Sequence, residues 1–242
     1  MIILSVGMPR AGSGWYYNLT HDLVTACGGQ DAREIRRRYR LQSILTEVNC
    51  NIGALTPRRL LLALVPSLLG NTFVLKAHAG PTPFALRLVR LGLLRPTYIY
   101  RDPRDALLSA YDNGQRALKS GRPNAFSHLV DFEAALEFMR GYVRISEAWL
   151  AAPGTLHCRY ENLLADYDGE AARLAEFLRL EAGSPAVQAV IERYRPEGAS
   201  RERRGTHFNQ GRTGRFRQAL TPEQQERLGR EFGPYLERMG YE

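Results

Sequence analysis

Four side chains in the first half of the sequence could bind an anionic group and move a proton. Arg10 lies in a glycine-containing loop after the first apolar run. Lys76 and His78 are two residues apart, and Arg101 follows a β-branched and aromatic run. Guanidinium and ammonium groups bind phosphate or sulfate oxygens, and a neutral imidazole can accept a proton near physiological pH. These residue types favour a site for a nucleotide with two separated anionic groups and a base beside it.

The loop around Arg10 has the composition of a phosphate-binding loop. It reads Met-Pro-Arg-Ala-Gly-Ser-Gly-Trp over residues 8–15 and joins an apolar run to an amphipathic stretch. Glycines let the backbone turn, so that successive N–H groups and the N-terminus of the next helix face an anion. The Gly-Lys-Ser/Thr ending that binds Mg²⁺ in P-loop nucleoside triphosphatases is missing, so we expect no metal. The predicted contacts of the anion are Arg10, Ala11, Gly12, Ser13 and Gly14.

Four short β-branched or aromatic runs predict the strands that position these residues, at residues 2–6, 72–76, 97–101 and 155–159. Helices are expected at residues 13–27, 57–69, 83–91, 103–119, 129–151, 163–180 and 186–194, with a last helix starting at Thr221. Alternating strands and helices imply a parallel sheet flanked by helices, and no linker divides the chain. We therefore predict one α/β domain over residues 1–242, with the site at the carboxyl ends of the strands.

The composition is that of a soluble globular protein with a basic surface. Lys and Arg number 33 against 25 Asp and Glu, which gives a net charge of +8. The first residues lack the basic start and apolar run of a signal peptide. The most apolar run, residues 60–69, covers about half a membrane span. We therefore expect a cytoplasmic protein without a transmembrane segment.

The three cysteines offer no metal site. Cys27, Cys50 and Cys158 form no CxxC pair and have no histidine at metal-binding spacing. We expect buried free thiols in a reducing compartment.

Five segments, in family order, resemble the motifs of sulfotransferases that use 3′-phosphoadenosine 5′-phosphosulfate (PAPS). Residues 8–15 are similar to the family's Pro-Lys-Ser-Gly-Thr-Thr-Trp loop, and residues 76–78 match its Lys-x-His segment. The others resemble its 3′-phosphate motif, its Tyr-Glu-Asp-Leu segment and its C-terminal glycine-rich loop, at residues 100–111, 160–163 and 211–221. The resemblance implies an enzyme that transfers a sulfuryl group in line from PAPS to an alcohol or phenol, without a metal.

The resemblance also assigns catalytic roles. His78 is expected to accept the proton of the acceptor hydroxyl. Lys76 and Arg10 are expected to stabilise charge on the sulfuryl and bridging oxygens. Arg10 stands where the family usually has lysine; it can neutralise the leaving oxygen but is a poor proton donor.

The nucleotide-binding residues implied by the resemblance are spread along the chain. They are Trp15, Arg101, Ser109, Tyr160, Gly211 and Arg212. The tryptophan is expected to stack on adenine, and the first arginine and the serine to bind the 3′-phosphate. Asn209 and Gln210 stand where the family's C-terminal loop usually has Arg-Lys, so Arg212 is a further candidate for the 3′-phosphate.

Several of these residues have structural alternatives. Arg101 and Arg104 could form ion pairs with neighbouring aspartates at the start of the next helix. Ser109 could bond a preceding carbonyl within that helix. Trp15 and Tyr160 could be core aromatic residues.

Two further runs have alternative interpretations. The arginine-rich residues 33–40 could be a solvated helix face or a site for an acidic acceptor. The apolar residues 60–69 are expected to be a buried helix face, with a lid over an apolar acceptor pocket as the alternative.

Two other functions compete with sulfuryl transfer. A P-loop nucleotide or small-molecule kinase would need the missing Gly-Lys-Ser/Thr and a magnesium-binding acid. A basic module for nucleic acid or anionic membranes would explain the net charge, but no nucleic-acid motif is present, so we expect no nucleic-acid partner. The partner expected is a small-molecule or other hydroxylated acceptor, held by parts of residues 30–56, 79–84 and 112–130.

Overall fold

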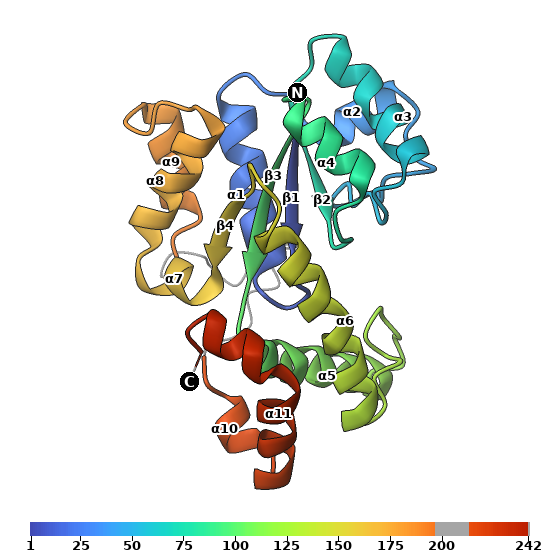
Figure 1. Ribbon diagram of the computed structural model, residues 1–242. Coiled ribbons are helices and arrows are strands. Elements are labelled where there is room, and N and C mark those ends of the chain that lie inside the picture. The colour runs from blue at the N-terminus through green and yellow to red at the C-terminus, as the bar shows by residue number, and fades with distance from the viewer. Residues whose placement is uncertain (197–212, 242) are drawn as a thin grey trace.

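The computed structural model describes residues 1–196 and 213–241 (Figure 1). Its centre is a four-stranded sheet in the order β2-β1-β3-β4, in which all neighbouring strands are parallel. The strands are β1 Ile2–Gly7, β2 Phe73–Ala77, β3 Leu94–Tyr100 and β4 Leu156–Arg159. The helices are α1 Ser13–Ala26, α2 Ala32–Arg38, α3 Pro57–Leu68, α4 Pro83–Arg90, α5 Pro103–Lys119, α6 Phe132–Leu150, α7 Tyr160–Ala165, α8 Tyr167–Leu178, α9 Pro185–Arg193, α10 Phe216–Ala219 and α11 Pro222–Arg238.

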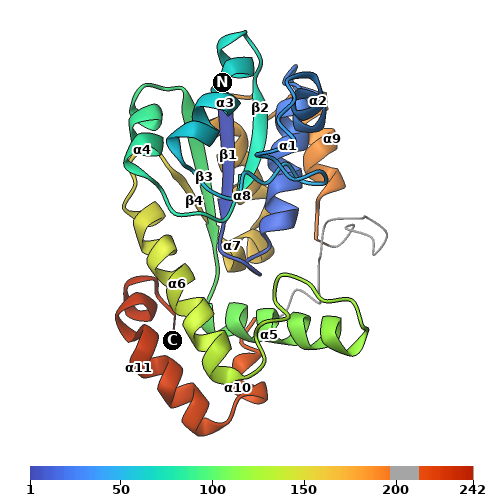
Figure 2. The ribbon, with the colours of Figure 1, turned by 90° about the vertical axis from the view of Figure 1, so that its right-hand side faces the viewer.

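Helices cover both faces of the sheet (Figure 2). Because side chains alternate along a strand, Ile2, Leu4 and Val6 of β1 enter one core while Ile3 enters the other. Helices α1, α8 and α9 pack on the side of Ile3, whereas α4 and α6 pack on the side of Leu4. The predicted α/β fold, a parallel sheet flanked by helices, is confirmed.

The register of the strands brings their carboxyl ends to one edge of the sheet. Ser5 of β1 lies opposite Lys76 on one side and Thr97 on the other. The backbone N–H of Met8 donates to the Ile99 carbonyl at 2.9 Å, so β1 and β3 leave the sheet close together. The polar residues that follow β1, β2 and β3 therefore emerge side by side.

Capping side chains start the helices that carry site residues and close the fold. α5 begins at Pro103, and the Asp102 carboxylate accepts the backbone N–H of Arg104. α11 begins with a capping box, in which Thr221 and Gln224 each accept the other's backbone N–H. A proline at the first helical position loses no helical hydrogen bond, and a cap satisfies donors that the first turn leaves free. Both predicted helix starts are confirmed.

Several elements differ from the sequence prediction, and α6 begins at Phe132, three residues later than expected. The helix expected over residues 163–180 is divided, because Asp166 ends α7 and caps α8 by accepting the N–H of Gly169. β3 begins three residues earlier than expected, because Leu94 to Pro96 pair with β1 before β4 joins at Thr97. The short helix α10 has no counterpart in the prediction.

Within the described part of the chain, the apolar run at residues 60–69 is covered on one side only. Leu60 and Leu64 of α3 are buried in the core. Leu68 and Leu69, at the end of the same helix, are largely exposed. The prediction of a buried helix face is therefore correct for the inner side of α3 and wrong for its outer side.

The exposure of the three cysteines and the character of the helices bear on two further predictions, buried thiols and no transmembrane segment. Cys50 and Cys158 are buried free thiols as expected, whereas Cys27 is exposed because it follows the end of α1. Within the described ranges, no helix has both the length and the apolar character that crossing a membrane requires.

Candidate active site

A cavity of about 510 Å³ lies at the carboxyl edge of the sheet, where β1, β2 and β3 end. Its volume is in the range of small-molecule sites. It is lined by Pro9, Arg10, Gly12, Ser13, Gly14, Trp15, Asn49, Asn51, Lys76, His78, Arg101, Ser109, Asn113, Asn124, Ala125, Phe126, Phe138, Tyr142 and Tyr160. The structure thus brings together the predicted site residues that it describes, except Ala11, whose side chain is buried in the core. Gly211 and Arg212 lie outside the described residues.

The loop between β1 and α1 turns through two residues with left-handed backbone conformations. They are Arg10, with φ 66°, and Gly12, with φ 75°, which is the N-cap of α1. This conformation costs a residue with a Cβ roughly 1 kcal/mol, so Arg10 is held under strain at the cavity wall. The first N–H groups of a helix have no partners within the helix, so the start of α1 offers donors to an anion.

Glycine is needed at two points because other atoms approach the backbone closely. A Cβ on Gly7 would lie 2.6 Å from the Cβ of Ser13. A Cβ on Gly12 would lie 2.8 Å from two atoms of the Tyr160 ring. The first contact lets α1 start directly against β1, and the second lets the tyrosine pack on the loop.

The position of His78 fixes its tautomer. Its Nδ1 lies 2.6 Å from the carbonyl oxygen of Gly7. A carbonyl only accepts, so Nδ1 carries the proton and the neutral ring keeps a lone pair on Nε2. Burial and the nearby charge of Lys76 lower the pKa of His78 to about 4, against the opposing effect of the Gly7 hydrogen bond. The imidazole is therefore neutral at physiological pH and can accept a proton at Nε2.

Lys76 and Arg10 are cations that are largely withdrawn from water. Lys76 is 7% exposed, and burial together with the charge of Arg10 lowers its pKa to about 8. Burial also lowers the pKa of Arg10, and the charges of Arg116 and Arg101 add to this effect. Among the described residues that line the cavity there is no aspartate or glutamate. The cavity therefore favours an anion.

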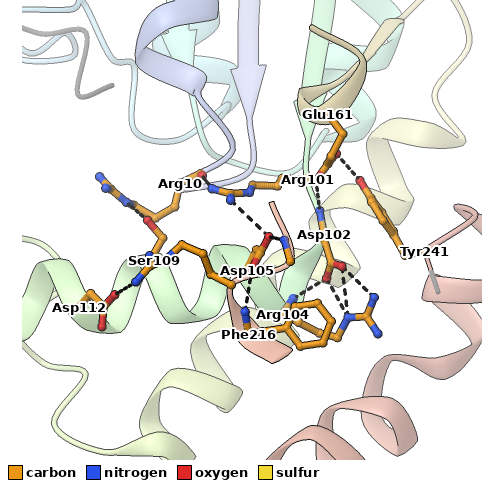
Figure 3. Close-up of polar contacts among 12 residues, drawn as sticks. Arg10, Arg101, Asp102, Arg104, Asp105, Ser109, Asp112, Glu161, Phe216 and Tyr241 are labelled. Carbon is orange, nitrogen blue, oxygen red and sulfur yellow. Dashed lines mark hydrogen bonds and ion pairs between the residues drawn. The ribbon is translucent and has the colours of Figure 1, made fainter. Parts of the chain in front are cut away.

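Arg101 and Ser109 are linked directly to the loop (Figure 3). Arg101 donates from Nη1 to the backbone carbonyl of Arg10 at 3.3 Å, and the Nε of Arg10 donates to Ser109 Oγ at 3.1 Å. The Arg101 guanidinium also lies over the Tyr160 ring, 4.6 Å from its centroid. The two predicted anion sites, one at the loop and one at the start of α5, are thus neighbours.

Asp105 is a site residue that the sequence motif contains but to which the sequence assigned no binding role. Its buried carboxylate lies 3.4 Å from Nη2 of Arg101. It also accepts the backbone N–H groups of Gly214 and Phe216, at 2.6 and 3.1 Å. One carboxylate therefore holds both Arg101 and the start of α10, as Figure 3 shows.

Arg104 follows the structural alternative. Its guanidinium forms a two-pronged ion pair with the Asp102 carboxylate, with a closest distance of 2.8 Å. It also lies over the Phe216 ring, 4.1 Å from its centroid. This residue holds α10 against the start of α5 and does not line the cavity.

Trp15 combines core packing with a place in the cavity wall. Only 1% of its surface is exposed, its Nε1 donates to the Tyr194 carbonyl at 2.9 Å, and its ring stacks on Tyr167. Tyr160 is also mostly buried, and burial raises the pKa of its hydroxyl. The core alternative thus describes the contacts of both side chains in this structure, while stacking on adenine stays a prediction.

The wall of the cavity also includes residues that the sequence did not single out. Asparagines and Phe126 come from two of the loops predicted to hold an acceptor, whereas residues 79–84 do not contribute to the described lining. Phe138 and Tyr142 come from α6 and were not predicted. Their spacing of four places them on one face of that helix, which is the signal that could have found them.

The sequence was compared with known proteins. A profile described as "Sulfotransferase domain" matches residues 2–240. The chain belongs to the sulfotransferase domain family. The family resemblance predicted from the five motifs is therefore confirmed. No curated protein matches the sequence at the significance level applied.

Solved sulfotransferase-fold structures share the architecture at low sequence identity. Retinol dehydratase, solved with retinol and PAP, is 18% identical, with a TM-score of 0.61 over 97% of this chain and 81% of that one. The structure of the same enzyme with androsterone and inactive cofactor PAP is 17% identical, with a TM-score of 0.60 over 97% of this chain and 80% of that one. Mouse sulfotransferase SULT7A1 complexed with PAP is 13% identical, with a TM-score of 0.59 over 98% of this chain and 84% of that one. At these identities the likeness establishes the fold of this sulfotransferase.

The described part of the chain contains no group of three or more histidine, cysteine, aspartate or glutamate residues that could hold a metal ion. The polar groups of the cavity are cations, amides and hydroxyls, which suit anions better than cations. The residues present therefore fit an anionic nucleotide.

The close contact at Gly12 predicts a specific mutational effect. Gly12→Ala adds a Cβ at positive φ and drives it into the Tyr160 ring, so we expect a loss of about 2 to 4 kcal/mol in the free energy of unfolding. The matched control is Gly28→Ala, which has φ 89° and nothing within 4 Å of its added Cβ. It should lose only about 1 kcal/mol. Urea denaturation measures both, and equal losses would contradict the contact.

Proposed function

We propose that this sulfotransferase transfers a sulfuryl group from PAPS to the hydroxyl of a small molecule, with His78 as the general base. The observation that carries the proposal is the single cavity lined by Arg10, Lys76 and Arg101 and by a neutral imidazole. Such a cavity matches a donor with anionic groups at both its 5′ and 3′ positions.

The donor would be held at two places. The backbone N–H groups at the start of α1, with Arg10 and Lys76, would bind the 5′-phosphosulfate. Arg101 and Ser109 would bind the 3′-phosphate, and Asp105 would keep the arginine in place from behind. Trp15 and Tyr160 would contact the adenosine. Gly211 and Arg212 stay candidates for further contacts.

In the proposed reaction the acceptor oxygen attacks sulfur in line with the bond to the bridging oxygen. The new S–O bond forms as the bond to the nucleotide breaks, and the acceptor proton moves to Nε2 of His78. The bridging oxygen gains negative charge, which Arg10 and Lys76 stabilise. Catalysis of this transfer needs correct positioning of the sulfuryl group and fixed positive charge beside it. The cationic side chains of the protein can supply that charge without a metal ion.

The donor would also change the basicity of the site. Burial and the charge of Lys76 hold the pKa of His78 low. Anionic groups bound beside both residues favour their protonated forms and raise both pKa values. The imidazole would thus become a stronger base when the donor is bound, and the lysine would stay charged.

The outer part of the cavity would bind the acceptor. Phe126, Phe138 and Tyr142 form an aromatic wall, and four asparagines add neutral hydrogen-bonding groups. Retinol and androsterone, the small molecules in the retinol dehydratase structures, are hydroxylated or ketonic hydrocarbons that such a wall could accommodate. A hydroxylated small molecule with an apolar body is therefore the acceptor class that we propose.

Nucleotide binding can be tested by thermal unfolding with adenosine 3′,5′-bisphosphate (PAP). At 100 times its Kd the ligand should add about 2.7 kcal/mol, which raises the Tm by about 5 to 10 °C. Arg101→Ala should reduce the shift by more than half. The control is Arg144→Ala, an exposed arginine on α6 that removes the same charge. Absence of a shift in the wild type would overturn the proposed function.

The role of His78 predicts a separation of binding from turnover. His78→Ala should keep the PAP shift but lower kcat by about 10²- to 10⁴-fold, because only proton transfer is lost. The control is His157→Gln, a half-buried histidine of β4 outside the cavity lining, which should keep kcat. Turnover is measured with labelled PAPS and a panel of alcohols and phenols. A kcat unchanged in His78→Ala would rule out the base.

A further inference from the structure

From Leu60 to Val65 helix α3 is apolar on its inner and its outer side, but the described residues cover only the inner one. Its inner side packs into the core through Leu60 and Leu64. Its outer side and the residue after it expose five aliphatic side chains, namely Leu61, Leu62, Val65, Leu68 and Leu69. The last two are 68% and 67% exposed. Apolar helix surface is ordinarily buried, and nothing within residues 1–196 and 213–241 covers the outer face of α3.

The exposed leucines continue onto a neighbouring helix end. Leu91, which follows α4, is 64% exposed. The loops after α3 and α4 flank the same end of β1, because Met1 donates to the Asn71 carbonyl and Ile2 to the Leu93 carbonyl. In Figure 1 this end of the sheet lies at the top, opposite the carboxyl ends where the cavity opens. We call the exposed residues 61, 62, 65, 68, 69 and 91 the leucine surface.

Positive charge surrounds the leucine surface. No aspartate or glutamate occurs between residues 48 and 101 of the sequence. Exposed arginines stand at the start of α3 and on α4, as Arg58, Arg87 and Arg90. The basic helix α2 lies beside the end of α3, because the Tyr39 hydroxyl accepts a hydrogen bond from Asn71. The surface therefore combines apolar side chains with cations at its rim.

We infer that the leucine surface docks this protein onto an anionic lipid bilayer, with α3 lying in the plane of the interface. Aliphatic side chains enter the boundary between headgroups and acyl chains, and the arginines at the rim pair with acidic headgroups. Charge disfavours a second copy as the occupant, since a symmetric contact would bring the arginines of the two copies together. None of the surface residues lines the cavity, so docking leaves the site accessible.

The test is sedimentation of the full chain with lipid vesicles. We expect binding to vesicles of two parts phosphatidylcholine and one part phosphatidylserine, with much weaker binding to phosphatidylcholine alone. Leu68→Glu combined with Leu69→Glu should weaken binding at least tenfold, because it puts two carboxylates into the apolar contact. Arg87→Ala combined with Arg90→Ala should weaken it about tenfold and reduce its dependence on salt.

The matched control is Leu118→Glu, at an exposed leucine of α5 outside the leucine surface that is 42% exposed. It should bind vesicles like the wild type. Thermal unfolding and the PAP shift should be unchanged in the Leu68/Leu69 double variant, which separates docking from folding and from the proposed reaction. Absence of binding to the anionic vesicles, or equal binding by the double variant, would overturn the inference. The inference would also be overturned if light scattering showed that the wild type is a dimer and that the Leu68/Leu69 double variant is a monomer.

Discussion

The repulsion among cations that share one buried cavity is the constraint on which the rest of the structure depends. Arg10, Lys76 and Arg101 face the same space, and burial with the charge of Arg10 lowers the pKa of Lys76 to about 8. The Asp105 carboxylate pairs with Arg101, just before α5, and its other contacts are two backbone N–H groups. The remaining unfavourable energy is recovered when an anion binds. Affinity for an anionic donor is therefore built into the site.

The parallel sheet is what forces these charges together. Its register places the ends of β1, β2 and β3 side by side, so each strand delivers its cation to the same edge. The contacts at Gly7 and Gly12 then press the loop against β3 and Tyr160. The left-handed backbone at Arg10, between these two contacts, is held by the surrounding packing. The parallel order of the strands thus determines both where the three cations lie and how strongly they repel one another.

Much of this could be predicted from the sequence, for physical reasons. Strand ends followed by Arg10, His78 and Arg101 identify the functional edge, because parallel strands share one direction. Contacts distant in sequence could not be predicted, such as the Asp105 carboxylate with the backbone after residue 212, or the aromatic wall from α6. Nor does an apolar run reveal which of its sides the protein covers, so the outer leucines of α3 became visible only in the structure.

Proton uptake on PAP binding tests the central claim most directly. Calorimetry at pH 8 in buffers of different ionisation enthalpy gives the number of protons bound with each nucleotide. Since Lys76 is half-protonated there and an anion raises its pKa, we predict uptake of about half a proton, and PAP affinity that falls as the pH rises through 8. Lys76→Met should abolish the uptake. Proton release, no uptake, or the same uptake in that variant would contradict the account.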